Sequence, residues 1–236
     1  MKIWLQKYKK VFKNICVFRF FLYLCRAKRM NMQKTKSISL YKQQLRTKIL
    51  ETAIVAFVKE GIKQVKMDDV SKDFSISKRT VYEIFGNKEQ LLYECVEHYY
   101  YDRVARMQVK AEHCKNVMEI LLSTYKLKVN EFKQTNPQFY SDLKKYPKIQ
   151  EFLNEQHVLM RAMMQKFFER GVKEGYFRKD VNYEIAGHMY DALGEYMVNK
   201  QLYSQYQIED IFHNLIFASL RGFCTDKGID AIDKMI

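Results

Sequence analysis

Apolar side chains recur at intervals of three and four residues along most of the chain, which is the spacing of amphipathic helices. The first such stretch predicts a helix over residues 42–60, with Gly61 placed where a C-terminal cap is expected. Two short helices are predicted next, over residues 68–74 and 78–85. A three-residue break separates them, and its last residue, Ser77, is a good N-cap for the third helix.

Long helices are predicted for the rest of the chain. Asn87 followed by Gln90 resembles a capping box that opens a fourth helix, and helices continue to about residue 173. The last two helices are predicted over residues 182–203 and 207–224. Interruptions are expected near His113, at Asn136-Pro137, at Tyr146-Pro147 and across residues 171–180.

The composition supports an all-α fold. Only 8 Gly and 2 Pro occur in 236 residues, too few for the frequent turns of a sandwich or a βαβ protein. The 5 Cys are widely spaced and form no C-x-x-C pair, so neither a disulfide framework nor a zinc knuckle is indicated. We therefore expect a globular protein of the reducing cytoplasm.

Positive charge is concentrated in the first part of the chain. The formal net charge is +14, of which residues 1–31 hold nine Lys and Arg and no acidic residue. Residues 32–92 hold twelve basic and seven acidic side chains, and residues 93–236 hold twenty of each. A basic module on a neutral, apolar-rich body suggests polyanion binding, although a charge run is often only a solvated face.

The first 31 residues alternate basic and aromatic side chains around an apolar stretch over residues 15–25. That stretch is too short for a membrane span, and Arg19 interrupts it. Two interpretations stay open: a basic amphipathic surface helix, or leader sequence upstream of a start at Met30 or Met32. We favour the leader, because nothing downstream requires the segment.

The two short helices in a basic region predict a helix-turn-helix, in which the second helix presents its first turn to the major groove. Lys78, Arg79 and Thr80 occupy that turn. Lys and Arg can donate to guanine O6 and N7, and Thr offers a hydroxyl and a methyl group to thymine. We expect these three residues to read bases, the alternative being that they are only solvated.

The same region resembles the DNA-binding domain of TetR-type (TetR/AcrR) bacterial transcriptional regulators over about fifty residues without a gap. The resemblance rests on Arg46 to Leu50 with Ala53, Phe57 and Glu60-Gly61, on Met67 to Ser71, on Ser75 to Phe85 and on Asn87 to Leu92. It implies that the phenol of Tyr82 and the ammonium of Lys88 contact DNA phosphates. A phenol and an ammonium beside a helix N-terminus can both donate a hydrogen bond to a phosphate oxygen.

Two further details concern this domain. Lys42, Arg46 and Lys48, near the start of the first helix, are additional phosphate candidates, although each can equally be an ordinary surface residue. The family has Thr or Ser, which caps the second helix, where this chain has Met67. Methionine caps poorly, so we expect Asp68 to take over the cap.

The last two helices carry apolar residues over more of their surface than one neighbour can cover. A second subunit can supply the missing cover, and the resemblance implies dimerisation through these helices as a four-helix bundle. The predicted interface residues are Met189, Leu193, Met197, Leu215 and Leu220. The partner is then a second copy of the chain.

The middle helices, over residues 88–173, are rich in Met, Phe and Tyr. Such stripes are more often core than pocket, yet the resemblance implies a cavity for a small-molecule effector here. The sequence does not select the effector-binding residues, the effector, the operator or the regulated genes.

Enzyme signatures are absent from the sequence: it has no Gly-rich phosphate loop, no G-x-S-x-G and no H-E-x-x-H. Two acid and histidine ladders merit mention as metal candidates. They are Glu94, His98 and Asp102, and Glu184, His188, Asp191 and Glu195. Such ladders are more often surface or interface networks, so we expect no metal, no cofactor and no catalytic residue.

These observations predict three parts: a basic extension over residues 1–38 that is not required for the fold, a three-helix helix-turn-helix domain over 39–90, and a helical effector-binding and dimerisation domain over 91–236. The predicted function is a cytoplasmic, ligand-responsive transcriptional regulator. We expect a repressor that binds double-stranded DNA at a palindromic operator as a homodimer and has no membrane span. The alternative is a helical dimeric small-molecule-binding protein or enzyme that has lost DNA binding.

Overall fold

The computed structural model describes residues 40–234, and over these residues the predicted all-α fold is confirmed. The described elements are α3 (Leu40–Glu60), α4 (Met67–Asp73), α5 (Lys78–Phe85), α6 (Lys88–His113), α7 (Val117–Gln134), α8 (Pro137–Leu143), α9 (Pro147–Lys173), α10 (Tyr183–Asn199), the 3-10 turn η1 (Leu202–Ser204), α11 (Ile208–Ile211), the π-helical η2 (Phe212–Phe217), α12 (Ala218–Arg221) and α13 (Asp226–Asp233). The hypotheses on residues 1–31 and on an extension over 1–38 lie outside the described residues.

The chain divides into two compact units after Arg46. The second unit, from Thr47 onward, contains the greater part of α3 and every later helix.

Local capping signals place the ends of the first helices. The Ser77 hydroxyl accepts a hydrogen bond from the Thr80 amide at 3.0 Å, as its N-cap position predicts. Asn87 caps α6 in the same way, through the Gln90 amide at 2.8 Å. The Gln90 side chain does not return a bond to Asn87 but donates to Glu94 at 2.9 Å, so only half of a capping box forms. Gly61 ends α3 with φ +92°, a conformation that glycine adopts without strain.

The cap of α4 differs from the prediction. Asp69, not Asp68, accepts the hydrogen bond from the backbone N–H of Lys66, the N-cap residue, at 3.0 Å. Asp68 instead pairs with Lys78. Met67 points into the core and is buried, so it takes no part in the cap. The side chain at the third helical position reaches back to the N-cap amide, so Asp69 supplies the acidic half of a capping box.

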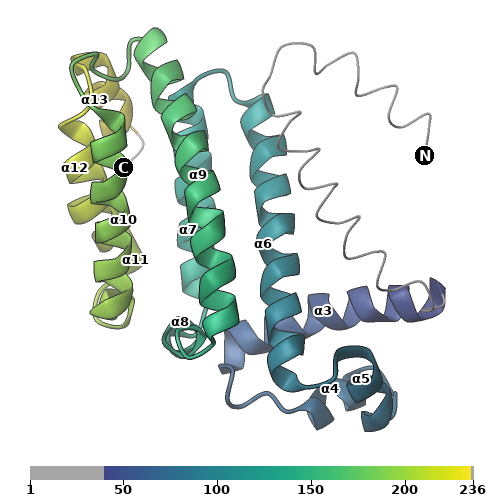
Figure 1. The fold of residues 1–236 in the computed structure, drawn as a ribbon. Helices are drawn as coiled ribbons and strands as arrows, with labels where there is room; N and C mark the ends of the chain where they lie inside the picture. The colour runs from purple at the N-terminus through teal and green to yellow at the C-terminus, as the bar shows by residue number, and fades with distance from the viewer. Residues whose placement is uncertain (1–39, 235–236) are drawn as a thin grey trace, which may run out of the picture. The chain divides into compact units, whose positions relative to one another are not determined.

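Helices α3 to α5 and the start of α6 enclose a small core, which we call the head core. Ile49, Phe57, Ile62, Val81 and Leu91 are among its fully buried members, each at 0% exposure. They come from four different segments, so the core fixes α5 relative to α3 and α6. In Figure 1, α4 and α5 lie beside the first turns of α6.

The body of the unit is built from long helices that run side by side (Figure 1). Helix α7 packs against α6 and α9 on one side and against α11 and α13 on the other. Helix α9 also packs against α10. Three of these helices exceed 17 residues: α6 has 26, α7 has 18 and α9 has 27. The central turns of α6, α7 and α9 therefore lie far from the loops that connect these helices.

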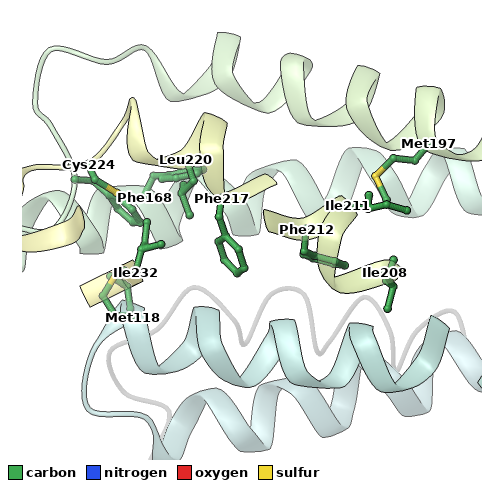
Figure 2. Close-up of a cluster of buried hydrophobic side chains, with 12 residues drawn as sticks. Met118, Phe168, Met197, Ile208, Ile211, Phe212, Phe217, Leu220, Cys224 and Ile232 are labelled. Atoms are coloured by element: carbon green, nitrogen blue, oxygen red, sulfur yellow. The ribbon is translucent and has the colours of Figure 1, made fainter. Parts of the chain in front are cut away.

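The C-terminal part of the body has a dense apolar core (Figure 2). Ile211, Phe212, Phe217 and Leu220 extend from one continuous helix, α11 to α12, whose middle is π-helical. Phe168 of α9 meets the same cluster. The helix predicted to reach residue 224 ends at Arg221, and the sequence analysis missed α13, which Thr225 caps.

Candidate nucleic-acid interface

The first turn of α5 presents the three predicted base-reading residues at the surface. The Arg79 side chain is 88% exposed, and Lys78 is also exposed. Thr80 is half-buried, and its hydroxyl lies 2.8 Å from that of Ser77. Val81 and Phe85, on the opposite side of α5, are buried in the head core. The amphipathic pattern of α5 thus orients Lys78 and Arg79 away from the protein.

Both cations at this turn have a carboxylate partner. Lys78 Nζ lies 2.6 Å from an Asp68 oxygen, and this hydrogen bond raises the pKa of Lys78 above its ordinary value. Arg79 Nε lies 2.9 Å from Glu83 one turn later. These pairs are exposed and therefore weak, so a DNA phosphate or base can replace either carboxylate at small cost.

The two residues that the family resemblance assigns to phosphate lie near each other in sequence but on different helices. Tyr82 is exposed on α5, and Lys88 is the first residue of α6. The Lys88 ammonium donates to the Lys63 carbonyl at 3.4 Å. Burial lowers the pKa of Lys88, while the negative charges of Asp142 and Asp69 oppose that shift. An ammonium beside a helix N-terminus can receive a phosphate oxygen.

The remaining phosphate candidates are on α3. Lys48 is exposed. Arg46 is the last residue of the first unit. Their contact with phosphate stays a prediction.

Asn136 links the body to the end of α3, and the sequence analysis missed this role. Its backbone N–H donates to the Val58 carbonyl at 2.8 Å, and its side-chain amide donates to the Lys59 carbonyl at 3.4 Å. The same side chain caps α8 by accepting from the Gln138 amide at 2.9 Å. The Asn-Pro pair signals a helix start, but only the fold brings it to the end of α3.

Asp142 of α8 is a second missed residue, and it is 2% exposed. Burial alone would raise the pKa of its carboxyl, but hydrogen bonds from Lys145 at 2.5 Å and Gln138 at 3.1 Å outweigh burial and lower it. Lys63 adds a favourable positive charge. The Asp142 carboxylate of the body therefore lies near Lys63, which follows α3, and near Lys88, which begins α6.

The predicted dimer residues fall into two groups. Met197 and Leu220 are buried in the chain's own C-terminal core, so their assignment to an outer interface is corrected. Met189, Leu193 and Leu215 are half-buried, and their contact with a partner stays a prediction. Consecutive residues of a helix point in different directions, about 100° apart. Met197 therefore faces α11 and is buried, whereas the neighbouring Tyr196 is 50% exposed.

The acid and histidine ladders serve other contacts. Asp102 pairs with Arg106 at 2.9 Å, and Asp191 pairs with Arg161 of α9 at 2.8 Å. Within residues 40–234, no three His, Cys, Asp or Glu side chains gather closely enough to hold a metal ion. None of the helices in that range is long and apolar enough to cross a bilayer.

Two small pockets lie among the described residues. One, of about 130 Å³, lies between α3 and α4 and is lined by Thr52, Ala56, Val65, Asp69 and Phe74 among others. The second, between α6 and α7, encloses only about 10 Å³. The effector cavity implied by the resemblance stays a prediction.

Comparison with known proteins agrees with this geometry. Residues 49–95 match the family described as bacterial regulatory proteins, tetR family. This match spans the head core, α4, α5 and the start of α6. A search of curated protein sequences finds no significant match.

Solved structures resemble most of the chain at low sequence identity. A protein from Saccharomonospora viridis, crystallised with choline and described as a transcriptional regulator, has TM-score 0.65 and 18% identity, and the match covers 78% of this chain and 99% of that one. A TetR-family regulator from Cytophaga hutchinsonii has TM-score 0.62 and 17% identity, with 81% and 100% covered. Reduced E. coli NemR has TM-score 0.60 and 14% identity, with 76% and 96% covered.

The match assigns residues 49–95 to a helix-turn-helix domain of the type found in bacterial regulatory proteins of the tetR family. The chain as a whole shares the fold of solved transcriptional regulators, including one of the TetR family.

Proposed function

We propose that the protein is a cytoplasmic repressor that binds a palindromic operator as a homodimer and releases it when a small molecule binds the body. The observation that carries this proposal is the first turn of α5: Ser77 caps it, the head core holds it, and Lys78 and Arg79 project from it. The proposed division is a DNA-binding domain over residues 39–90 and an effector-binding and dimerisation domain over 91–236.

Base reading and phosphate contact are separable by experiment. Arg79→Ala should weaken operator binding by about 1–3 kcal/mol and relax the sequence preference, because a base contact is lost. Lys88→Ala should weaken binding to all sequences alike and flatten the dependence on salt concentration. Titrations of operator and random DNA at several salt concentrations measure both. Equal losses on the two DNAs for Arg79→Ala would assign that residue to phosphate instead.

An exposed apolar stripe on α10 supports the homodimer. Ile185 is 67% exposed and Tyr196 is 50% exposed, and they lie on one side of the helix with Met189 and Ala192. Large apolar side chains gathered on a surface favour a protein partner. In a dimer, two α5 helices would lie about 34–36 Å apart, or a multiple of this, for successive major grooves.

Light scattering tests the dimer with a matched pair of variants. Met189→Glu places a charge in the stripe and should yield folded monomers at micromolar concentration. His188→Glu places the same charge on the exposed polar side of α10 and should stay dimeric. Leu220→Glu should instead unfold the C-terminal core, because Leu220 is buried within one chain. A monomeric wild-type protein would contradict the proposal.

Effector response and repression draw support from the fold and from one relative. The Saccharomonospora viridis protein was crystallised in complex with choline, so a protein of this fold can bind a small molecule. The alternative, a helical ligand-binding protein without DNA function, predicts no salt-sensitive retention on heparin and no shift of DNA from its own upstream region. In vitro transcription from that region should fall when the protein is added, and a rise would indicate an activator.

A further inference from the structure

Lysine side chains gather where α8 meets the connection between α3 and α4. Lys145, between α8 and α9, donates to the Asp142 carboxylate at 2.5 Å. The same carboxylate lies near Lys63 of the α3–α4 connection and near Lys88, the first residue of α6. We call Lys63, Lys88 and Lys145 the junction lysines. They come from three segments of the chain, so only the fold brings them together.

Hydrogen bonds join these segments independently of the charges. The side-chain amide of Asn136, which caps α8, donates to the Lys59 carbonyl at the end of α3 at 3.4 Å. A Cβ on Gly61 would lie 3.9 Å from the same amide nitrogen. The Lys88 ammonium donates to the Lys63 carbonyl at 3.4 Å. The start of α8, the α3–α4 connection and the start of α6 are therefore linked by direct contacts.

The junction holds more positive than negative charge. Asp142 is 2% exposed, and both hydrogen bonds to its side chain end on one oxygen, which leaves the other buried without a partner among the described residues. Asp69 is a second carboxylate whose charge reaches Lys88, and it already accepts the hydrogen bond that caps α4. Three ammonium groups therefore face two carboxylates. A buried carboxylate is stable only beside cations, so Asp142 keeps these lysines in place.

Two of the junction lysines are well exposed. Lys63 lies at the surface, and the side chain of Lys145 is 55% exposed although its ammonium touches Asp142. The neighbouring Lys144 points elsewhere, since its ammonium donates to the side-chain carbonyl of Asn199 at the end of α10. The Lys145 ammonium is thus ordered by the protein and still open to an anion from solvent.

The junction lies on the side of the molecule that carries the helix-turn-helix. In Figure 1, α8 lies at the end of the body from which α4 and α5 extend. Lys88 begins α6, and the N-terminus of a helix attracts anions. Duplex DNA carries one phosphate charge for about every 1.7 Å of its axis. A cation beside one phosphate contact is therefore close to further phosphates.

We propose that Lys63 and Lys145 contact the phosphate backbone of the same DNA duplex as Lys88, so that the body takes part in DNA binding. The partner is the sugar-phosphate backbone, which positions the protein without specifying sequence. This inference rests on the proposed function, because it adds contacts to the DNA that α5 would read. It goes beyond that function in assigning a DNA contact to a residue outside the helix-turn-helix domain.

The dependence of DNA binding on salt tests each contact. Fluorescence anisotropy of a labelled duplex of random sequence, about 30 base pairs long, gives the slope of log affinity against log salt concentration between about 50 and 200 mM NaCl. Lys63→Gln and Lys145→Gln should each make this slope shallower by about 0.9 per bound protomer, because one phosphate contact is lost. Each should also weaken binding at about 100 mM NaCl by about fivefold. Lys88→Gln is the reference for a phosphate contact.

Two further variants control for charge and for structure. Lys144→Gln removes the same charge from the adjacent residue and should leave the slope unchanged, because that ammonium is directed to Asn199. Lys145→Arg keeps the positive charge and should keep the wild-type slope. Urea unfolding identifies any stability lost with the bond between Lys145 and Asp142. A purely structural role of Lys145 would lower stability and leave the slope of the folded protein unchanged.

Chemical modification of the wild-type protein needs no substitution. Acetic anhydride acetylates exposed lysine ammonium groups, and mass spectrometry measures the extent at each site. Excess duplex should reduce acetylation of Lys63 and Lys145 severalfold and leave that of Lys144 and Lys166 unchanged. Lys166 is exposed on α9, about 28 Å of helix beyond Pro147. Equal acetylation of Lys145 with and without duplex would overturn the proposal.

The outcomes separate this inference from the proposed function. If Lys88→Gln flattens the slope while Lys63→Gln and Lys145→Gln match the wild type, DNA binding stands and the added contacts are wrong. Equal flattening by Lys144→Gln and Lys145→Gln would reveal a general effect of charge and would also overturn the contact. A wild-type protein that binds no duplex even at low salt overturns both. Shallower slopes together with protection of Lys63 and Lys145 support both.

Discussion

The head core and the middle of the body differ in how completely they bury their apolar side chains. In the head, Phe57, Ile62 and Leu91 have no exposed surface. In the body, Leu121, Tyr125, Met164 and Phe167 are only partly buried, although they are equally apolar. Both regions consist of amphipathic helices, so the difference lies in tertiary packing and not in composition.

This difference suits two kinds of binding. A helix that reads base edges must hold its side chains in one arrangement, and a fully buried core restricts α5 to one position. A site that admits a small molecule between helices must instead open at low cost, and partly buried contacts are cheaper to break. The proposed function therefore assigns a preformed surface to the head and an adaptable one to the body.

The two regions meet through α8 and the residues beside it. Asn136 bonds to the last carbonyls of α3, and Asp142 lies near Lys63 and Lys88. A movement of α8 that follows ligand entry would therefore reach both the end of α3 and the start of α6. The contacts are few and polar, so they can shift without disrupting either core.

Truncating one aromatic ring in each region tests the comparison most strongly. Phe57→Ala should lower the free energy of unfolding by about 3–5 kcal/mol, because it opens a cavity in the head core. Phe167→Ala should cost roughly half as much, since its ring already touches solvent. Urea unfolding followed by circular dichroism measures both. Equal losses would show that the middle of the body is packed as tightly as the head.

Neutralising Asp142 should have a smaller effect. Asp142→Asn should lower the free energy of unfolding by about 1–2 kcal/mol at pH 7, because its hydrogen bond with Lys145 loses its charge. The folded carboxyl has its pKa below the ordinary 3.8, so its stabilisation is present above that pH and is lost as the pH falls through the folded pKa. The difference between wild type and variant should stay constant from pH 7 to 4.5 and shrink below pH 3.8. A difference that grows on acidification would contradict the assigned sign.

Glycine-to-alanine changes in two helices should give the smallest effects and opposite signs. Gly171→Ala should destabilise by about 1 kcal/mol, because its Cβ would lie 2.1 Å from the buried Phe177 ring and the clash outweighs the gain in helix propensity. Gly187→Ala should stabilise by up to about 1 kcal/mol, since a Cβ there meets no atom within 4 Å. Thermal unfolding compares the two. Stabilisation by both changes would show that the Phe177 ring can move away from a Cβ at position 171 at little cost.

Features that depend on a few neighbouring residues were determined by the sequence alone. Ser77 begins α5, Asn87 begins α6 and Gly61 ends α3, because each cap involves residues within one helical turn. The helix-turn-helix and its exposed Lys78 and Arg79 follow from these caps and from the apolar period. The all-α class follows in the same way.

Features that depend on distant segments were decided only by the tertiary structure. The apolar stripe of α10 did not reveal that Met197 faces the chain's own core while Tyr196 stays exposed, because that requires the position of α11. The burial of Asp142 and the pairing of Arg103 with Glu131 likewise depend on segments far apart in the sequence. Periodicity tells which side of a helix is apolar, whereas the partner helix decides which of those side chains lose their contact with water.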